Sequence, residues 1–147
     1  MNRPTWHQYF MSIATLVAQR ASCKRGQVGA VLVKNHTIIS TGYNGAPSNT
    51  CHCTDFDCNI AITTYANGEQ EENCQSVVHA EINAIINAAV NGVSIAGATI
   101  YITHSPCRHC YKALINAGIK TIYYKRAYKL ESLRSLVQPE INLILIQ

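Results

Sequence analysis

Two stretches decide how this chain folds: VHAEINAIINAAVNG at positions 78–92 and SPCRHCYKALINAG at positions 105–118. Each starts with side chains that bind metals and continues with the periodicity of a helix. His79 offers an imidazole at one helix start, and Cys107 and Cys110 offer two thiols at the other. A helix N-terminus favours negative charge and lowers the pKa of a thiol. The sequence therefore predicts one metal site at the place where both helices begin.

The predicted ligand set is typical of a catalytic zinc ion. Three protein ligands leave the fourth tetrahedral position open for water, and zinc lowers the pKa of that water from about 15.7 to about 7. Glu81 lies two residues after His79, so its carboxylate can reach the water without binding the metal. We expect Glu81 to act as the general acid and base.

Each part of this pattern also has a structural interpretation. A lone C-x-x-C is typical of a structural zinc or a redox pair, and a lone histidine on a helix more often belongs to the core or the surface. The order of the ligands and the presence of Pro106 before the first cysteine favour the catalytic interpretation. Glu81 favours it too, because a closed structural site has no use for a carboxylate beside an open position.

Composition narrows the class of protein. A length of 147 residues predicts one domain that spans residues 1–147. Apolar residues make up 48% of the chain, enough for a core, whereas charged residues make up 14% against a typical ~25%, which favours an oligomer. The net charge of +4 suits a small anionic ligand and is too modest for a nucleic-acid partner.

The cellular compartment is predicted from the lack of a membrane-spanning run and of an export signal in the sequence. No apolar run approaches the ~20 residues needed to cross a bilayer, and no signal core stands at the N-terminus. Seven cysteines are an odd number in a chain without an export signal, so a disulfide framework is not expected. We expect a cytoplasmic protein with reduced thiols and no membrane partner.

The hydrophobic pattern predicts elements in the order α-β-β-α-β-α-β-α-β. The predicted helices are 5–20, 78–91, 106–117 and 130–137, and the predicted strands are 28–33, 37–43, 98–103, 120–124 and 141–146. Strand–helix–strand connections from residue 98 onward imply parallel pairing. The expected fold class is α/β, a three-layer α/β/α sandwich with a mixed five-stranded sheet.

Two local expectations follow from the same pattern. Residues 48–75 show no regular periodicity, and the acidic run in this segment is expected to be a solvated loop. That run consists of Glu69, Glu71 and Glu72. In the second helix, one face is lined by Ile82, Ile85, Ile86 and Ala89.

Together these motifs resemble the cytidine deaminase-like superfamily, and within it the deoxycytidylate (dCMP) deaminases. Four further stretches carry the resemblance: Val28-Gly29-Ala30-Val31, TGYNGAP at 41–47, THSPC at 103–107 and AGIK at 117–120. The resemblance implies a hydrolase that converts dCMP and water to dUMP and ammonia, which supplies dUMP for thymidylate synthesis. It also implies that His79, Cys107 and Cys110 bind zinc and that Glu81 carries protons.

The resemblance implies further contacts and partners. Substrate contacts are expected at Asn44, Ala80 and Ser105, although Asn44-Gly45 taken alone is equally typical of a plain turn. Family members are commonly hexamers that dCTP activates and dTTP inhibits, often with Mg²⁺ on the triphosphate. The expected effector contacts are Lys24, Arg25, Gly45 and Asn49.

Some phage and bacterial relatives carry a second, structural zinc ion, and the resemblance therefore implies a candidate second metal site in this chain. The segment 48–75 has little apolar content, so a metal ion would help to fold it. The candidate ligands are Cys23, Cys53, Cys58 and Cys74, with His52 beside them. Buried free cysteines are common, so four unliganded thiols are the alternative.

Two rival functions use the same motifs. A deaminase that acts on tRNA adenosine or single-stranded cytosine would need a basic groove with stacking aromatic rings. Tyr101, Tyr123 and Tyr124 fall in predicted strands, where we expect them to be core residues. A zinc-binding module without catalytic activity is the other rival, and Glu81 argues against it.

Overall fold

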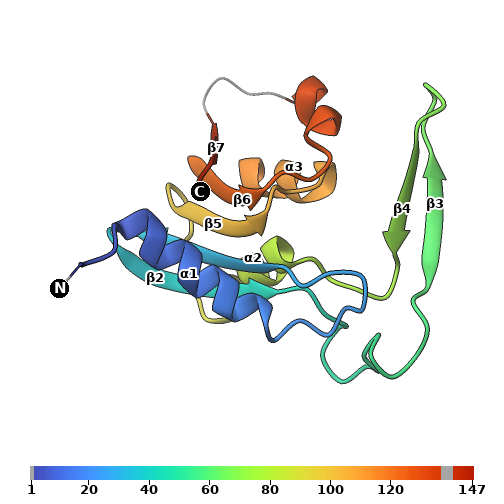
Figure 1. Ribbon diagram of the computed structural model, residues 1–147, viewed down its shortest axis with the longest axis horizontal. Coiled ribbons are helices and arrows are strands. Elements are labelled where there is room, and N and C mark those ends of the chain that lie inside the picture. Colours follow the sequence, from blue (N-terminus) through green and yellow to red (C-terminus); the bar gives the residue numbers. More distant parts are fainter. Residues whose placement is uncertain (1, 137–140) are drawn as a thin grey trace.

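The computed structural model describes residues 2–136 and 141–147. At its centre lies a five-stranded sheet in the order β2-β1-β5-β6-β7 (Figure 1). The strands are β1 (Gly29–Lys34), β2 (Thr37–Tyr43), β5 (Thr99–His104), β6 (Thr121–Arg126) and β7 (Asn142–Leu145). β1 runs antiparallel to both β2 and β5, whereas β5, β6 and β7 are parallel. The mixed five-stranded sheet predicted from the sequence is confirmed.

Helices cover both faces of this sheet (Figure 1). They are α1 (Trp6–Ala18), α2 (Ala80–Val90), α3 (Arg108–Asn116) and a 3-10 helix, η1 (Leu130–Leu136). α1 packs on one face through Phe10 and Met11 against Val31 and Tyr101. α2 and α3 contribute to the core on the other face, which confirms the three-layer sandwich. Residue 137, the last of the predicted helix 130–137, lies outside the described residues.

α2 contacts β2 through small side chains, and of its isoleucines Ile85 packs against the core from a partly buried position. The buried alanines of this helix are Ala80, Ala84 and Ala88. A Cβ atom built on Gly42 of β2 would collide with the backbone of Ala80 and Ala84, so helix and strand approach closely. No isoleucine fits between them, and the face of Ile82, Ile85, Ile86 and Ala89 lies to the side of this contact or in solvent, with Ile86 46% exposed.

Polar side chains fix the position of α2 along β2. The Nδ2 atoms of Asn83 and Asn87 donate to the carbonyl oxygens of Tyr43 and Thr41, each at 2.8 Å. The hydroxyl of Ser40 donates to the carbonyl of Ala84 at 2.7 Å. These bonds prevent α2 from sliding along the strand and therefore hold the start of the helix in place.

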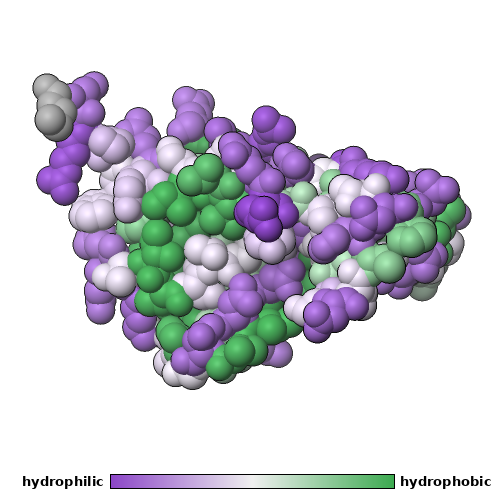
Figure 2. Space-filling view, turned by 90° about the horizontal axis from the view of Figure 1, so that it is seen from below, coloured by the Kyte–Doolittle hydropathy of each residue, from purple (hydrophilic) through white to green (hydrophobic). Residues whose placement is uncertain are grey.

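Both α1 and α2 leave apolar side chains exposed to solvent. Val90 is 79% exposed, and Leu16 on α1 is 63% exposed. Figure 2 shows a continuous hydrophobic area on the underside of the molecule. None of the described helices is both long enough and apolar enough to cross a membrane.

A β-hairpin occupies part of the segment that was expected to be irregular. β3 (Ile60–Thr64) and β4 (Gln70–Cys74) pair antiparallel and project from the body as an arm (Figure 1). The turn spans residues 65–68 and is closed by a hydrogen bond from the N–H of Gly68 to the carbonyl of Tyr65, with a φ of +85° at Gly68. Asn-Gly between two extended runs is a strong hairpin signal. The prediction that residues 60–64 and 70–74 are irregular was therefore wrong, although the sequence contained a signal for the hairpin.

The acidic run is not uniformly solvated. Glu71 is 7% exposed, accepts a hydrogen bond from Tyr65 and pairs with Lys129 at 3.1 Å. Burial alone would raise the pKa of Glu71, but the bonds from Tyr65 and Lys129 lower it. The prediction of a solvated loop was therefore wrong at Glu71, which connects the hairpin to the chain segment after β6.

Replacing Gly42 with Ala should lower the free energy of unfolding by about 1–3 kcal/mol, because the added methyl group would overlap the α2 backbone. Urea denaturation followed by circular dichroism measures the change. Gly26→Ala is the matched control, since a Cβ atom at Gly26 meets no atom within 4 Å. Equal stability of G42A and the unchanged chain would contradict the close helix–strand contact.

Candidate active site

His79, Cys107 and Cys110 converge at the starts of α2 and α3. The Nδ1 atom of His79 lies 3.5 Å from the sulfur of Cys107 and 3.4 Å from that of Cys110. All three ligand atoms lie within 4.8 Å of one another. A tetrahedral zinc ion with ordinary bond lengths separates a nitrogen and a sulfur ligand by about 3.5 Å. The observed spacing therefore fits a zinc ion held by these three side chains.

The backbone directs the ligands toward one point. His79 and Cys107 are the N-cap residues of their helices, with extended ψ angles of 154° and 169°, and neither side chain caps its own helix. Val78 and Gly45 exchange two backbone hydrogen bonds, of 2.9 and 3.1 Å. This pairing ties the residue before His79 to the end of β2, so the close α2–β2 contact positions the imidazole.

The ligand cluster carries negative charge on Cys107. Hydrogen bonding from the Cys110 side chain lowers the pKa of Cys107 to about 4, with help from His79 and the backbone N–H of Cys110. The same contact with Cys107 raises the pKa of His79. A thiolate beside an imidazole suits a divalent cation, which replaces the protons that the ligands share.

Glu81 lies in the first turn of α2 and is 4% exposed. Burial raises the pKa of its carboxyl group to about 7. A carboxyl group that titrates near neutral pH can both accept and donate a proton. In the described part of the chain, Glu81 is not a member of the ligand group, so its carboxylate is available for proton transfer.

A cavity of about 320 Å³ opens onto these groups. This volume lies at the lower end of the range for small-molecule sites. Three residues predicted to contact substrate are in its wall, namely Asn44, Ala80 and Ser105. The wall also contains residues that sequence reasoning did not select, including Glu72, Asn73, His104 and Tyr128. Glu72 and Asn73 reach it because β4 forms, which the Asn67-Gly68 turn could have indicated.

The Asn44 side chain holds one wall of the cavity together. Its Oδ1 accepts from the backbone N–H of Val28 at 2.7 Å, and its Nδ2 donates to the carbonyl of Gly26 at 2.9 Å. The residue is 7% exposed, so both bonds are shielded from water. Asn44 therefore fixes residues 26–28, and its contact with substrate stays a prediction.

Ser105 positions Tyr128 at the cavity. The Ser105 hydroxyl donates to the carbonyl of Tyr128 at 2.9 Å and accepts from its N–H at 2.6 Å. The hydroxyl thus binds the segment after β6 to the residue just before Pro106. The Ser105 backbone N–H also donates to the carbonyl of Arg126 at 2.8 Å, and the contact of Ser105 with substrate stays a prediction.

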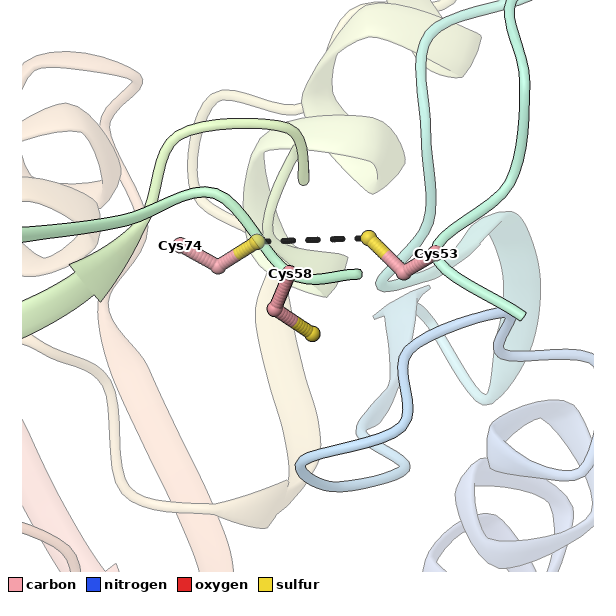
Figure 3. Close-up of side chains that lie close together, drawn as sticks. All are labelled: Cys53, Cys58 and Cys74. Carbon is pink, nitrogen blue, oxygen red and sulfur yellow. Dashed lines mark hydrogen bonds between the residues drawn. The ribbon is translucent and has the colours of Figure 1, made fainter. Parts of the chain in front are cut away.

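A second group of sulfur atoms lies at the base of the hairpin. The sulfurs of Cys53 and Cys74 face each other at 3.9 Å, and Cys58 lies beside them (Figure 3). Two thiolates on a tetrahedral zinc ion are separated by about 3.8 Å. Burial and the neighbouring thiols, Cys23 among them, raise the pKa of Cys53 to about 11. Three of the four predicted ligands are thus together, and Cys23 is near them.

The residues expected to contact an effector do not form one group. Arg25 lines the cavity and pairs with Glu72. Lys24 donates to the carbonyl of Phe56 at 3.1 Å, and Asn49 lies in an exposed loop with a φ of 63°. Gly45 is engaged in its backbone pairing with Val78. Arg25 is the member of this set that reaches the cavity.

Most of the chain matches a known protein family. The family described as the cytidine and deoxycytidylate deaminase zinc-binding region matches residues 4–126. ComE operon protein 2 of Bacillus subtilis is 42% identical over 129 residues, in a match that covers 88% of this chain and 64% of that protein. The chain therefore spans just under two thirds of that relative.

The names of two relatives of similar length include a substrate. The deoxycytidylate deaminase of Mycobacterium phage D29 is 37% identical over 131 residues, which cover 86% of this chain and 98% of that enzyme. The crystal structure of the dCMP deaminase of cyanophage S-TIM5, in complex with dCMP and dUMP, has a TM-score of 0.76 at 32% identity. That match covers 99% of this chain and 100% of the cyanophage chain.

Replacing Asn44 with Ala should lower the free energy of unfolding by about 1–3 kcal/mol, because the chain loses two part-buried hydrogen bonds between this buried side chain and the backbone of residues 26–28. Thermal denaturation measures the loss. Asn91→Ala, which removes an exposed amide bonded to Asn87, is the control and should change stability by less than about 0.5 kcal/mol. If N44A were as stable as N91A, Asn44 would not hold the cavity wall.

Proposed function

The chain belongs to the cytidine and deoxycytidylate deaminase family, and from this membership we propose that it hydrolyses dCMP to dUMP and ammonia. The observation that carries the proposal is the convergence of His79, Cys107 and Cys110 beside the buried Glu81 at one cavity. The substrates in the names of the phage relatives support dCMP. The product dUMP would then supply thymidylate synthesis.

Zinc is the metal that fits the three ligands. One nitrogen and two sulfurs at the observed spacing suit tetrahedral zinc and leave one position open. When bound, zinc would act as a Lewis acid and make a water molecule more acidic. The residues of this chain would hold the ion through two thiolates and the His79 imidazole, and they would place Glu81 where its carboxylate does not bind the metal.

Glu81 would carry the protons of the reaction. Its carboxylate accepts a proton from the attacking water, whose oxygen forms a bond to C4 of the pyrimidine. The carboxyl group then returns the proton to the ring nitrogen, and a second proton follows the same route to the amino group. The C4–N bond breaks, and ammonia leaves. Water is the co-substrate and no oxidant is needed, so the enzyme would be a hydrolase.

A small nucleotide fits the site better than a nucleic-acid strand does. Tyr101 and Tyr124 are 4% and 7% exposed, and the ring of Tyr123 stacks on that of Tyr101 with 4.9 Å between the centroids. These rings belong to the core and are unavailable to stack on bases. The cavity of about 320 Å³ is also compact. Both observations favour dCMP over a tRNA or single-stranded DNA substrate.

We also propose a structural zinc ion on Cys53, Cys58 and Cys74, with Cys23 as the fourth ligand. The 3.9 Å separation of the Cys53 and Cys74 sulfurs supports it. The hairpin offers a physical reason, because most of β3 and β4 is exposed and an isolated two-stranded hairpin is marginally stable in water. A metal at its base would compensate for the missing core.

Regulation and assembly stay predictions of the family resemblance. They comprise activation by dCTP, inhibition by dTTP, Mg²⁺ on the triphosphate, and a hexamer. The exposed apolar residues Ile86 and Val90 support association of copies, because such surface is usually buried at an interface. Lys24, Gly45 and Asn49 remain candidates for effector contacts outside the catalytic cavity.

Replacing Glu81 with Gln should keep the zinc ion and lower kcat by about 100- to 10,000-fold, because the amide cannot transfer the protons. Ammonia release from dCMP and zinc content by mass spectrometry are measured on the same sample. Glu69→Gln, the same change at an exposed position, should leave both unchanged. Survival of activity in E81Q would remove Glu81 from the mechanism, and loss of zinc would make it a ligand.

The unchanged chain should contain two zinc ions, one for each ligand group. Replacing Cys58 with Ser should remove the ion at the hairpin and lower the melting temperature, because the hairpin loses its support. Cys51→Ser is the control, since Cys51 is exposed and outside the cluster. A single zinc ion in the unchanged chain would show that the hairpin thiols bind no metal.

A further inference from the structure

We propose that Lys129, held by the buried carboxylate of Glu71, is a positioning residue that fixes the ring of Tyr128 in the wall of the catalytic cavity. The inference rests on the proposed function, because its effect is measured on the binding of dCMP and of its product. It gives the chain segment after β6 a part in substrate affinity, and it makes that part depend on a contact with the hairpin.

The backbone of Tyr128 is fixed, whereas its ring needs a second support. The Ser105 hydroxyl binds both the N–H and the carbonyl of Tyr128. The residue lines the cavity and is 41% exposed, so core packing surrounds its ring only in part. A side chain on a fixed backbone still has several staggered rotamers. A contact that selects one of them would prepare the cavity wall before substrate arrives.

Lys129 supplies this contact. Its Nζ atom lies 5.1 Å from the centroid of the Tyr128 ring, within the distance of about 6 Å at which the face of a ring attracts a cation. The φ of Lys129 is +45°, which is uncommon for a residue other than glycine. Its carbonyl accepts from the N–H and the hydroxyl of Ser132, at 3.0 and 2.7 Å. These bonds hold Lys129 in an unfavourable conformation with its ammonium group beside the preceding ring.

Glu71 fixes the ammonium group of Lys129 through an ion pair. Its Oε1 accepts from Nζ at 3.1 Å, while its Oε2 accepts from the hydroxyl of Tyr65. The side chains of Lys129 and Glu71 are 33% and 9% exposed, so water screens this pair less than it screens a fully exposed pair. Burial alone would lower the pKa of Lys129, but its contacts with Tyr128 and Glu71 raise it. The group that faces the ring is therefore charged.

The same ion pair joins the cavity wall to the hairpin. Glu72 and Asn73 follow Glu71 directly and line the cavity. The Tyr65 ring lies 5.1 Å from the guanidinium carbon of Arg108, the first residue of α3. The hairpin thus contacts the body at several points around the cavity. A decisive experiment has to separate the positioning of the Tyr128 ring from the attachment of the hairpin.

Lys129→Met removes the ammonium group and nearly keeps the length of the side chain. It should raise the KM for dCMP and the Kd for dUMP by about 2- to 10-fold, the cost of ordering one side chain on binding. The kcat should stay within about twofold, because the wall binds substrate while Glu81 carries the protons. Lys129→Arg keeps the charge and should keep the affinity. Lys112→Met, the same change at an exposed position of α3, is the matched control.

A double-mutant cycle shows whether Lys129 acts through Tyr128. Tyr128→Leu removes the ring. If Lys129 positions the ring, K129M should raise the KM no further in the Y128L background. If Lys129 only fastens the hairpin, the two effects on KM should multiply, and that result would overturn the positioning role.

Tyr65→Phe gives an independent check on the hairpin. It removes one hydrogen bond to Glu71 and leaves the contact between Lys129 and the Tyr128 ring in place. The KM for dCMP should therefore stay unchanged, whatever the effect on the melting temperature. A rise in KM as large as that of K129M would make the hairpin, and not the ring, the cause.

The choice of ligands separates positioning from recognition of charge. A positioned ring does not distinguish charged from uncharged ligands, so K129M should weaken dUMP and deoxyuridine by the same factor in titration calorimetry. Weakening of dUMP alone would make Lys129 a phosphate ligand and would overturn the inference, while dCMP deamination by the unchanged chain stands. If the unchanged chain released no ammonia from dCMP, the proposed function would fail and the inference with it.

Discussion

The close contact of α2 with β2 at Gly42 is the constraint on which the candidate active site depends. Because this position has no side chain, the alanine face of α2 lies against the strand, and the hydrogen bonds from Asn83 and Asn87 fix its register. His79 stands at the start of that helix. The geometry of the ligand cluster therefore follows from backbone packing in the sheet layer and not from the ligands themselves.

The order of the elements could be predicted from the sequence because hydrophobic periodicity is a local property. The candidate metal ligands could be selected for a similar reason, since Cys107 and Cys110 are close in sequence and all three ligands stand at predicted helix starts. Other features depend on contacts between distant segments. The buried face of α2 depends on Gly42 in another strand, and Arg25 meets Glu72 across 47 residues of sequence. The hairpin was missed because its alternation is weak, with Ile60 and Ile62 both exposed.

The hairpin is held to the body by polar and sulfur contacts in place of a core. At one point Glu71 binds Lys129 and Tyr65, and at its base Cys74 lies with Cys53 and Cys58. Between these two attachments lie Glu72 and Asn73, which reach the cavity. A short strand thus both attaches the hairpin to the body and contributes three consecutive residues, Glu72, Asn73 and Cys74, to the cavity wall.

The exposed arm formed by β3 and β4 has a consequence for how such a molecule can diversify. The candidate active site stands at the starts of α2 and α3, which pack on the five-stranded sheet, where most substitutions disturb packing. The outer end of the arm, beyond its attachments at Glu71 and Cys74, contributes little to that core, so its length and residues can vary at small thermodynamic cost while the helix starts stay unaltered. New ligand preferences can thus be acquired on an appendage, with the reactive centre inherited intact.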